Sequence, residues 1–229
     1  YTEESDRGLD CFEDLGAPGT FTFDLAGGEA FLVLGTEAAT QGLDGPSLVE
    51  QVTSMRSAER ALRLAEPSPL VRAAAAYVVQ REEGRTVLAG YPWFLDWGRD
   101  TFISLRGLCL ATSRLSLARR VLVQWAGAVS HGMLPNRFSD SGESPEFNSV
   151  DASLWFIIAV RDLRLAEKRA NFTASTVEDW RLNAAIVGIL RGYAAGTGHG
   201  ISMDKDHLRK AGEPGVQLTC MDAKVGDHV

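Results

Sequence analysis

The sequence predicts a mainly α-helical fold for the larger part of the chain, preceded by the end of a β-rich domain. The charge balance changes near residue 66: residues 1–66 hold 13 acidic and 4 basic side chains, whereas residues 67–229 hold 17 and 19. Strand and turn signals gather in the first part, and apolar residues recur at helical spacing in the second. We therefore expect residues 1–45 to end a β-rich domain, residues 46–66 to form a linker or helical connection, and residues 67–229 to form a helical domain.

The first part contains a pattern typical of a β-hairpin. Residues 21–25 alternate between apolar and polar side chains, as a half-buried strand does. Residues 26–29 are expected to form a turn, and residues 30–35 a second strand. An isolated hairpin is marginally stable, so this pattern predicts more sheet around it.

The second part predicts about five consecutive helices with short or medium connections. The first follows Pro67 and Pro69 and continues to Val79, because proline suits a first turn and alanine favours helix. An aromatic-rich loop is expected over residues 85–98. The later helices are expected over residues 100–108, 115–129, 150–166 and 176–194, with an irregular tail from residue 196. This pattern suits paired antiparallel helices in a toroid or solenoid, without a repeat of fixed period.

Composition and charge argue against several classes of function. The 229 residues are 45% hydrophobic, which is enough to bury a sizeable core. A net charge of −7 without a basic tract argues against nucleic-acid binding. No apolar run approaches the ~18 residues that a membrane span needs. The three scattered cysteines and four histidines lack metal-ligand spacing, so we expect no metal site and a reducing, cytoplasmic location.

Aromatic and charged side chains are dense in residues 90–101. Aromatic faces pack on the apolar faces of sugars, while carboxylates and arginine bind sugar hydroxyls. A structural alternative is that Asp100 caps a helix, the tryptophans belong to the core and Arg99 pairs with Asp96. The candidate sugar-binding residues in this segment are Trp93, Asp96, Trp97, Arg99 and Asp100.

Two further segments carry polar candidates. Asn136 and Arg137 follow a predicted helix end, where they would either face a ligand or be solvated. Asp222 lies in the irregular tail, where it would bind a polar ligand or belong to a surface loop.

Asp151 is the candidate for acid–base chemistry. Ser149 suits an N-cap, which places Asp151 in the first helical turn with Trp155 one turn further on the same face. Desolvation beside an indole raises a carboxyl pKa and makes it a usable general acid, whereas the helix dipole favours the charged form. The structural alternative is an aspartate that complements the dipole above a core tryptophan.

In sequence order, four segments together resemble the glucosidase domain of bacterial and archaeal glycogen debranching enzymes, the amylo-α-1,6-glucosidases. They are YPWFLDWGRDT at 91–101, LPNRF at 134–138, NSVDASLW at 148–155 and MDAKVGD at 221–227. The resemblance covers residues 85–229 strongly, and residues 1–66 look like the end of the β-rich domain before it. One departure is Cys220, which stands where the family usually has a tryptophan.

The resemblance implies part of an (α/α)6 toroid of the six-hairpin glycosidase type. It implies hydrolysis of α-1,6-linked glucose on glycogen or a limit dextrin with inversion, without metal or organic cofactor. Asp151 matches the general acid, and Asp96, Arg99 and Asp100 match the glucose-binding segment, with Asn136, Arg137 and Asp222 as further carry-overs. The catalytic base is expected beyond residue 229, so this chain alone is expected to be inactive.

Other functions remain open from the sequence. The chain would also suit another (α/α)6 carbohydrase, such as a glucoamylase-like α-glucosidase or a trehalase-like enzyme. A non-catalytic glucan-binding protein would keep the aromatic subsite without the base. A helical scaffold for protein partners would not need Trp93, Trp97 or Asp151 for sugar binding.

Overall fold

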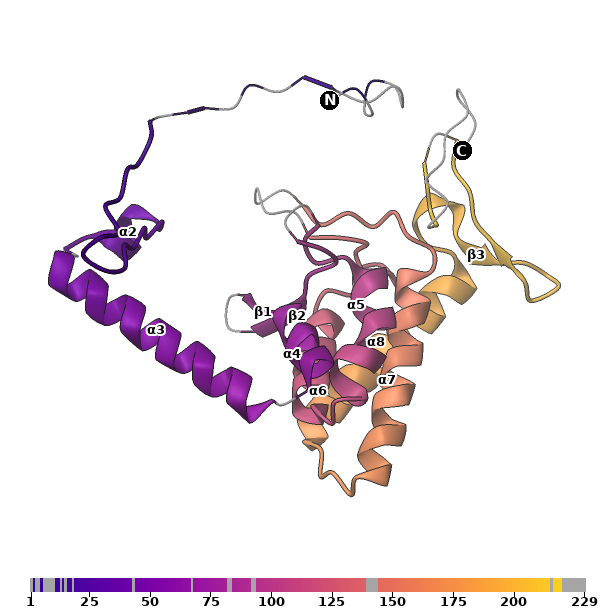
Figure 1. Cartoon of the computed structure of the whole chain (residues 1–229). Coiled ribbons are helices and arrows are strands. Elements are labelled where there is room, and N and C mark those ends of the chain that lie inside the picture. Colours follow the sequence, from indigo (N-terminus) through magenta and orange to yellow (C-terminus); the bar gives the residue numbers. More distant parts are fainter. Residues whose placement is uncertain are drawn as a thin grey trace. The chain divides into compact units, whose positions relative to one another are not determined.

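The computed structural model describes residues 2, 5, 11–12, 14, 16–17, 19–42, 44–66, 68–81, 84–91, 94–138, 144–214 and 216–219. The chain divides into two compact units, Tyr1–Leu62 and Arg63–Val229 (Figure 1).

Among its described residues, the first unit holds α2 (Glu37–Thr40) and most of α3 (Gly45–Ala65), whose last residues belong to the second unit. Helix α3 covers most of the segment over residues 46–66 that the sequence predicts as a linker or helical connection. Asp44 precedes it and exchanges hydrogen bonds with Ser47: the Ser47 amide donates to Asp44 Oδ1 over 2.9 Å, and the Asp44 amide donates to Ser47 Oγ over 2.8 Å. The bonds from Ser47 lower the pKa of Asp44, and the pair satisfies amides that the helix start leaves open.

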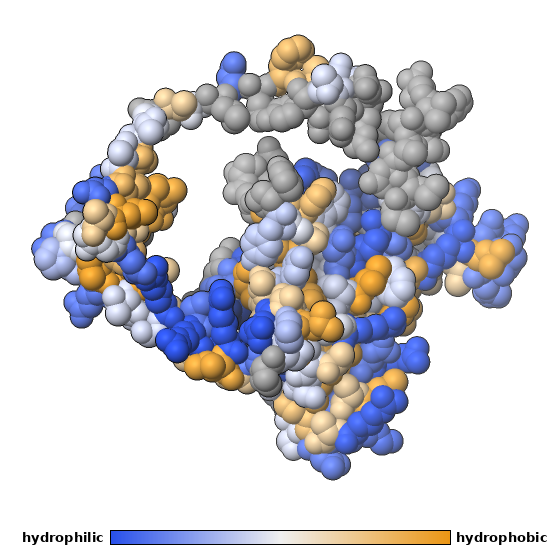
Figure 2. Space-filling model, viewed as in Figure 1, coloured by the Kyte–Doolittle hydropathy of each residue, from blue (hydrophilic) through white to orange (hydrophobic). Residues whose placement is uncertain are grey.

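The expected hairpin over residues 21–35 is wrong, because the structure assigns no strand to any described residue of this unit. The turn itself is present: the Gly28 amide donates to the Leu25 carbonyl over 3.3 Å, and Gly28 has a φ of 129°. Phe21, Leu25 and Leu34 are exposed, and Figure 2 shows apolar side chains on the surface around α2 and α3. Because their apolar side chains stay in solvent, the two short segments gain too little free energy from burial to form a β-ladder.

The second unit begins with α4 (Pro69–Ala76), which has Pro69 in its first turn, and an antiparallel hairpin. Strands β1 (Val78–Arg81) and β2 (Gly84–Val87) pair with Val78 opposite Val87 and Arg81 opposite Gly84. The sequence analysis extended the helix to Val79 and placed residues 85–98 in a loop, so it was wrong at this hairpin. β-Branched side chains favour strand, and pairing buries Thr86 and Val87.

The later helices match the expected segments with shifted ends. Helix α5 (Gly98–Leu105) continues into the π-helical turn η1 (Arg106–Leu110), and α6 (Leu115–Ala126), α7 (Ala152–Arg169) and α8 (Thr176–Ala195) follow. The tail holds a 3-10 turn, η2 (Gly198–Gly200), and the short strands β3 (Ser202–Met203) and β4 (Arg209–Lys210). Helix α5 packs on α7, and α6 packs on both α7 and α8 (Figure 1).

An aromatic cluster joins three of these helices. The ring centroid of Phe102 on α5 lies 5.1 Å from that of Trp125 on α6 and 5.3 Å from that of Phe156 on α7, both edge-on. All three rings are buried. Aromatic pairs in this geometry gain about 0.5–1.5 kcal/mol beyond the burial of their area. Buried aliphatic side chains extend the core along the helices, among them Leu105, Leu122, Val160, Leu163, Leu182 and Ile189.

A buried ionic cluster joins α6, α7 and α8. Arg119 donates from Nε and Nη2 to the two carboxylate oxygens of Glu167, each over 2.7 Å, and from Nη1 to Asp179 over 2.9 Å. The side chains of Arg119 and Glu167 are 3% and 7% exposed. The hydrogen bonds with Glu167 are the main cause that raises the pKa of Arg119. Because both charges are nearly excluded from water, each depends on its partner.

No helix within the described ranges has the length and apolarity that a membrane span requires.

We predict that Arg119→Met lowers the free energy of unfolding by about 3–5 kcal/mol, because it leaves the Glu167 carboxylate buried without its partner. Urea denaturation followed by circular dichroism measures the loss. Arg120→Met is the matched control, since Arg120 is the neighbouring exposed arginine on the same helix. Equal stability of the two variants would contradict a structural role for the ion pair.

Candidate functional site

The strongest polar contact at the start of α7 joins Arg99 to Asp151. Arg99 Nε donates to Asp151 Oδ2 and Arg99 Nη2 donates to Asp151 Oδ1, each over 2.7 Å. The two side chains are 17% and 26% exposed, so the pair is partly shielded and still open to solvent. A bidentate arginine–carboxylate pair fixes orientation as well as charge.

Ser149 supports the Asp151 carboxylate from the preceding loop. Its hydroxyl donates to Asp151 Oδ1 over 2.8 Å and accepts the Ala152 amide over 3.2 Å. Asp151 itself occupies the N-cap position, so the expected cap at Ser149 was two residues too early. Ser149 nevertheless accepts a hydrogen bond from the Ala152 amide in the first turn, as a capping side chain does.

Opposing effects set the pKa of Asp151. Burial, the largest effect, raises this pKa, while hydrogen bonds from Arg99 and Ser149 and the positive charge of Arg99 lower it. The lowering effects together prevail, so the pKa of Asp151 lies below its ordinary value. In this arrangement the side chain is a carboxylate at neutral pH.

A cavity of about 420 Å³ adjoins this pair on the other side of Arg99. Asp100, in the first turn of α5, is exposed along it, and Ser104 adds a hydroxyl one turn further on. The remaining lining is mostly apolar and comes from Tyr77, Val87, Leu88, Ala89, Ile103 and Leu108. An apolar lining with a few polar groups at one end is typical of a small-molecule site.

Asp96 is buried and bound to the β1–β2 hairpin. Its side chain is 2% exposed, pairs with Arg81 of β1, and accepts a hydrogen bond from the Thr86 hydroxyl of β2 over 3.2 Å. The alternative pairing of Arg99 with Asp96 is therefore wrong, since Arg99 pairs with Asp151. The expected contact between Asp96 and substrate stays a prediction, and the described role of Asp96 is to fix the segment before α5 to the hairpin.

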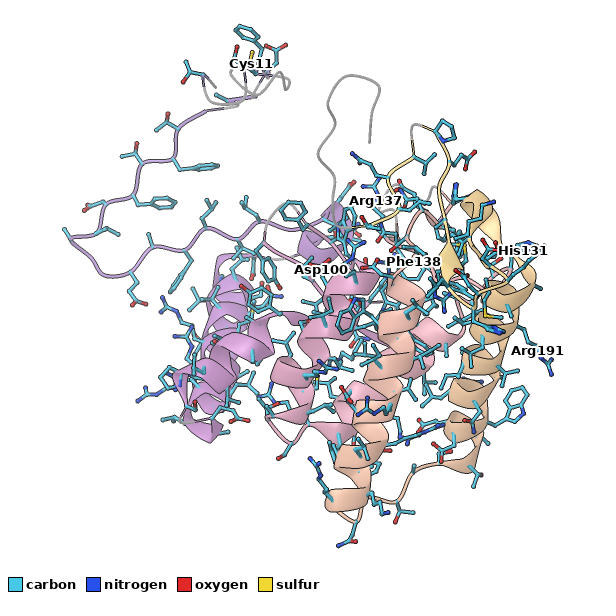
Figure 3. The ribbon with its side chains drawn as sticks, turned by 90° about the vertical axis from the view of Figure 1, so that its right-hand side faces the viewer. Cys11, Asp100, His131, Arg137, Phe138 and Arg191 are labelled. Carbon is cyan, nitrogen blue, oxygen red and sulfur yellow. The ribbon has the colours of Figure 1, made fainter. Side chains whose placement is uncertain are left out.

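Asn136 and Arg137 lie against the same segment. The Gly98 amide donates to the Asn136 carbonyl over 2.7 Å, and the guanidinium of Arg137 lies 5.6 Å from the ring centroid of Trp97. Arg137 also pairs with Glu146 over 2.5 Å. Figure 3 shows Asp100, Arg137 and Phe138 together at the loop end of the helices. The structure thus places five sequence candidates, Trp97, Arg99, Asp100, Asn136 and Arg137, on or against the segment at the start of α5, and one of them, Arg99, binds Asp151.

Some buried polar atoms in this region have no hydrogen-bond partner in the part of the chain that the structure describes. They are Thr101 Oγ1, Asn136 Oδ1 and Asn148 Oδ1. Buried polar atoms are nearly always paired, so each needs an explanation, and a bound polar ligand or water supplies one. All three belong to segments that carry the family resemblance. Trp93 and Asp222 lie outside the described residues.

A tight turn sets the position of the segment that carries Asn136. Ser130 and Met133 exchange backbone hydrogen bonds of 2.9 Å, with His131 at a φ of 48° and Gly132 at 78°, as in a type I′ turn. Gly132 lies against Gly192 of α8 so closely that a Cβ on Gly192 would stand 2.6 Å from Gly132 Cα. Beyond the turn, the Leu134 amide donates to Ser153 Oγ of α7 over 2.8 Å.

Comparison with known proteins decides the family. Residues 72–229 match the family model described as amylo-alpha-1,6-glucosidase. The chain belongs to this family. A stretch of 90 residues, 37% of this chain, is 38% identical to the glycogen debranching enzyme of Saccharomyces cerevisiae (strain ATCC 204508 / S288c). The match covers 6% of that protein's length.

Within this amylo-α-1,6-glucosidase family member, the sequence analysis missed the residues that hold the site in place. Arg81 and Thr86 bind Asp96, Ser153 binds the Leu134 amide, and the Tyr193 hydroxyl donates to the Val150 carbonyl over 2.8 Å. The closely spaced β-branched residues of β1 and β2 were a signal for the hairpin. Nothing in the local sequence pairs Ser153 or Tyr193 with its partner, because those contacts join distant segments.

The described residues contain no group of three or more His, Cys, Asp or Glu side chains that would hold a metal ion.

We predict that Asp151 contributes stability that is lost in acid. Its folded pKa lies below the ordinary value of 3.8, so the contribution is present above that value and disappears as the pH falls through the folded pKa. The difference in free energy of unfolding between wild type and Asp151→Asn should be largest above about pH 5 and narrow on acidification. Urea denaturation over a pH series measures it. A difference that widens in acid would contradict the pairing with Arg99.

We predict that Gly192→Ala destabilises the protein by about 1–3 kcal/mol, because the new methyl group would overlap the backbone of Gly132. Gly188→Ala, one turn earlier on α8, is the matched control. A Cβ there meets Val129 Cγ1 at an ordinary 3.7 Å, so that variant should gain up to about 1 kcal/mol from helix propensity. Thermal unfolding compares the two variants. Equal shifts of their unfolding midpoints would contradict a requirement for glycine at position 192.

Proposed function

We propose that this chain provides the general acid and part of the glucose-binding site of a glycoside hydrolase that removes α-1,6-linked glucose from glycogen or a limit dextrin. Family membership over residues 72–229 supports this chemistry. The observation that carries the proposal is the place of Asp151: a half-buried carboxyl at the start of α7, bound by Arg99 and beside the exposed Asp100.

We further propose that the helices form part of an (α/α)6 toroid. Helices α5 and α7 are in contact, and the Arg99–Asp151 bond joins their N-terminal ends, so the two run in the same direction. Helices α6 and α8 also contact each other. In a toroid of helical hairpins, successive helices alternate between an inner and an outer layer. Contacts between α5 and α7, and between α6 and α8, are the ones that such an arrangement requires.

A general acid must carry a proton, whereas the Arg99 pair keeps Asp151 ionised. We propose that sugar hydroxyls take over the hydrogen bonds of Arg99 when the glucan binds. Burial would then dominate the pKa of Asp151 and raise it, because burial is the largest single effect on this group. Asp151 would donate its proton to the glycosidic oxygen as the bond to the leaving chain breaks.

Inversion requires a second carboxylate, about 6.5–9.5 Å from the acid, that takes a proton from the attacking water. We assign this base to no described residue. Asp100 would bind glucose hydroxyls beside Arg99, and Trp97 would offer a ring face to the sugar.

We predict that Asp151→Asn lowers glucose release from a phosphorylase limit dextrin by a factor of about 10² or more, because the amide cannot protonate the leaving oxygen. The assay uses the full-length protein and measures free glucose at saturating dextrin. Binding of the dextrin should be retained, since the amide preserves the size of the side chain.

Asp206→Asn is the matched control, because Asp206 is an exposed aspartate in the turn between β3 and β4. Undiminished release by Asp151→Asn would overturn the assignment of the acid. Dextrin binding without release by either protein would favour a glucan-binding function, and release from an α-1,4-linked glucan or trehalose alone would favour a glucoamylase-like or trehalase-like enzyme.

A further inference from the structure

A second cavity, of about 530 Å³, lies away from the Arg99 pocket. One wall is the turn that contains His131, another is the loop that follows α8, and Phe147 closes it from the segment before α7. Its lining consists of Ser130, His131, Met133, Phe147, Gly196, Thr197, Gly198 and His199. The volume lies within the range of about 300–1,000 Å³ that small-molecule sites occupy.

The walls of this cavity are tied to one another. The Thr197 hydroxyl donates to the His131 carbonyl over 2.5 Å, which joins the loop after α8 to the turn. His199 Nδ1 lies 2.5 Å from Glu213 Oε2, and the Gly212 amide donates to the His199 carbonyl over 3.3 Å. Both histidines have positive φ, 48° and 56°, which a non-glycine residue adopts only where its surroundings hold it.

The lining chemistry selects a neutral ligand. Among the described lining residues there is no lysine, arginine, aspartate or glutamate, and the nearby carboxylate of Glu213 is engaged with His199. It offers hydroxyls from Ser130 and Thr197, two imidazoles and the ring of Phe147. Because Nδ1 of His199 faces Glu213, Nε2 is the ring nitrogen that remains for a ligand. A ring face beside several hydroxyl and imidazole groups suits a polyhydroxylated ring such as a sugar.

One short segment, residues 147–151, links the cavity to the Arg99 pocket. Phe147 lines this cavity, while Asp151, four residues later, binds Arg99, which lines the other pocket. Figure 3 shows His131 and Asp100 well apart at the loop end of the helices, with Phe138 between them in that view. A ligand that reached both would have to extend past a single sugar ring.

We propose that this cavity binds a second glucosyl unit of the same α-glucan, separate from the unit held at Arg99 and Asp151. The inference rests on the proposed function and deepens it: the chain would hold its substrate at two points, and its affinity would depend on the length of the glucan. His131, His199 and Phe147 would be the residues of this second point.

Titration of the full-length protein with maltoheptaose tests the proposal, with binding followed by calorimetry and by NMR of the histidine ring protons. In the wild type, the ring signals of His131 and His199 should shift and that of His207, outside the cavity, should not. Phe147→Ala and His199→Asn should each weaken binding by about tenfold. Asparagine tolerates the left-handed backbone at position 199, which limits the structural cost of the variant.

Phe21→Ala and His207→Asn are the matched controls, since Phe21 is exposed and lies in the first unit, and His207 also has a positive φ and lies outside the cavity. They should bind maltoheptaose as the wild type does. Each variant is first compared with the wild type in thermal unfolding. If one has lost its fold, the wild-type histidine signals alone decide the question.

Unchanged His131 and His199 signals under saturating maltoheptaose would overturn the proposal, as would full affinity in Phe147→Ala. If Asp100→Asn then abolished binding, the proposed function would stand without the second point. A wild type that fails to bind maltoheptaose would also overturn the proposal, while glucose release by wild type and Asp151→Asn would still decide the proposed function independently.

Discussion

The packing of α5 against α7 is the contact on which the rest of the second unit depends. Phe102 and Phe156 meet edge-on between the two helices, and Trp125 of α6 closes the cluster from the side. Because the helices run in the same direction, this apolar contact brings the N-terminal end of one beside that of the other. Arg99 and Asp151, 52 residues apart in sequence, come within 2.7 Å as a result. The position of the site is thus a consequence of core packing.

The two ends of α7 carry arginine–carboxylate pairs with opposite properties. At its N-terminal end, the Arg99–Asp151 pair is partly exposed, so water or a hydroxyl-rich ligand can replace either partner. Near its C-terminal end, the Arg119–Glu167 pair is almost wholly buried and has no such replacement. Similar bonds therefore differ in their access to solvent: one pair is open to exchange of partners, as the proposed function requires, and the other joins three helices.

Local sequence signals predicted which segments form helices better than they predicted which segments contact one another. The helical segments from residue 100 onward were found because apolar spacing and helix-end residues are local properties. The β1–β2 hairpin was missed because the alanine-rich helix before it made the β-branched residues Val78 and Val79 look like its continuation, although they pair with β2. The roles of the candidate residues stay predictions, and the structure pairs Arg99 with Asp151 where the structural alternative had paired it with Asp96. A carboxylate four residues away and one 52 residues away look equally plausible until the helices are packed.

The contact between Gly132 and Gly192 has a mechanical consequence. Side chains that touch can adjust by rotating about χ angles, whereas a contact between two glycine backbones is relieved only by moving a backbone. We therefore expect the turn and the last turns of α8 to move together as one piece. On one side that piece ends in His131 at the second cavity, and on the other it continues to Asn136 beside α5. A displacement of α8 would therefore move both His131 and Asn136, while the conformation of the turn between them stayed the same.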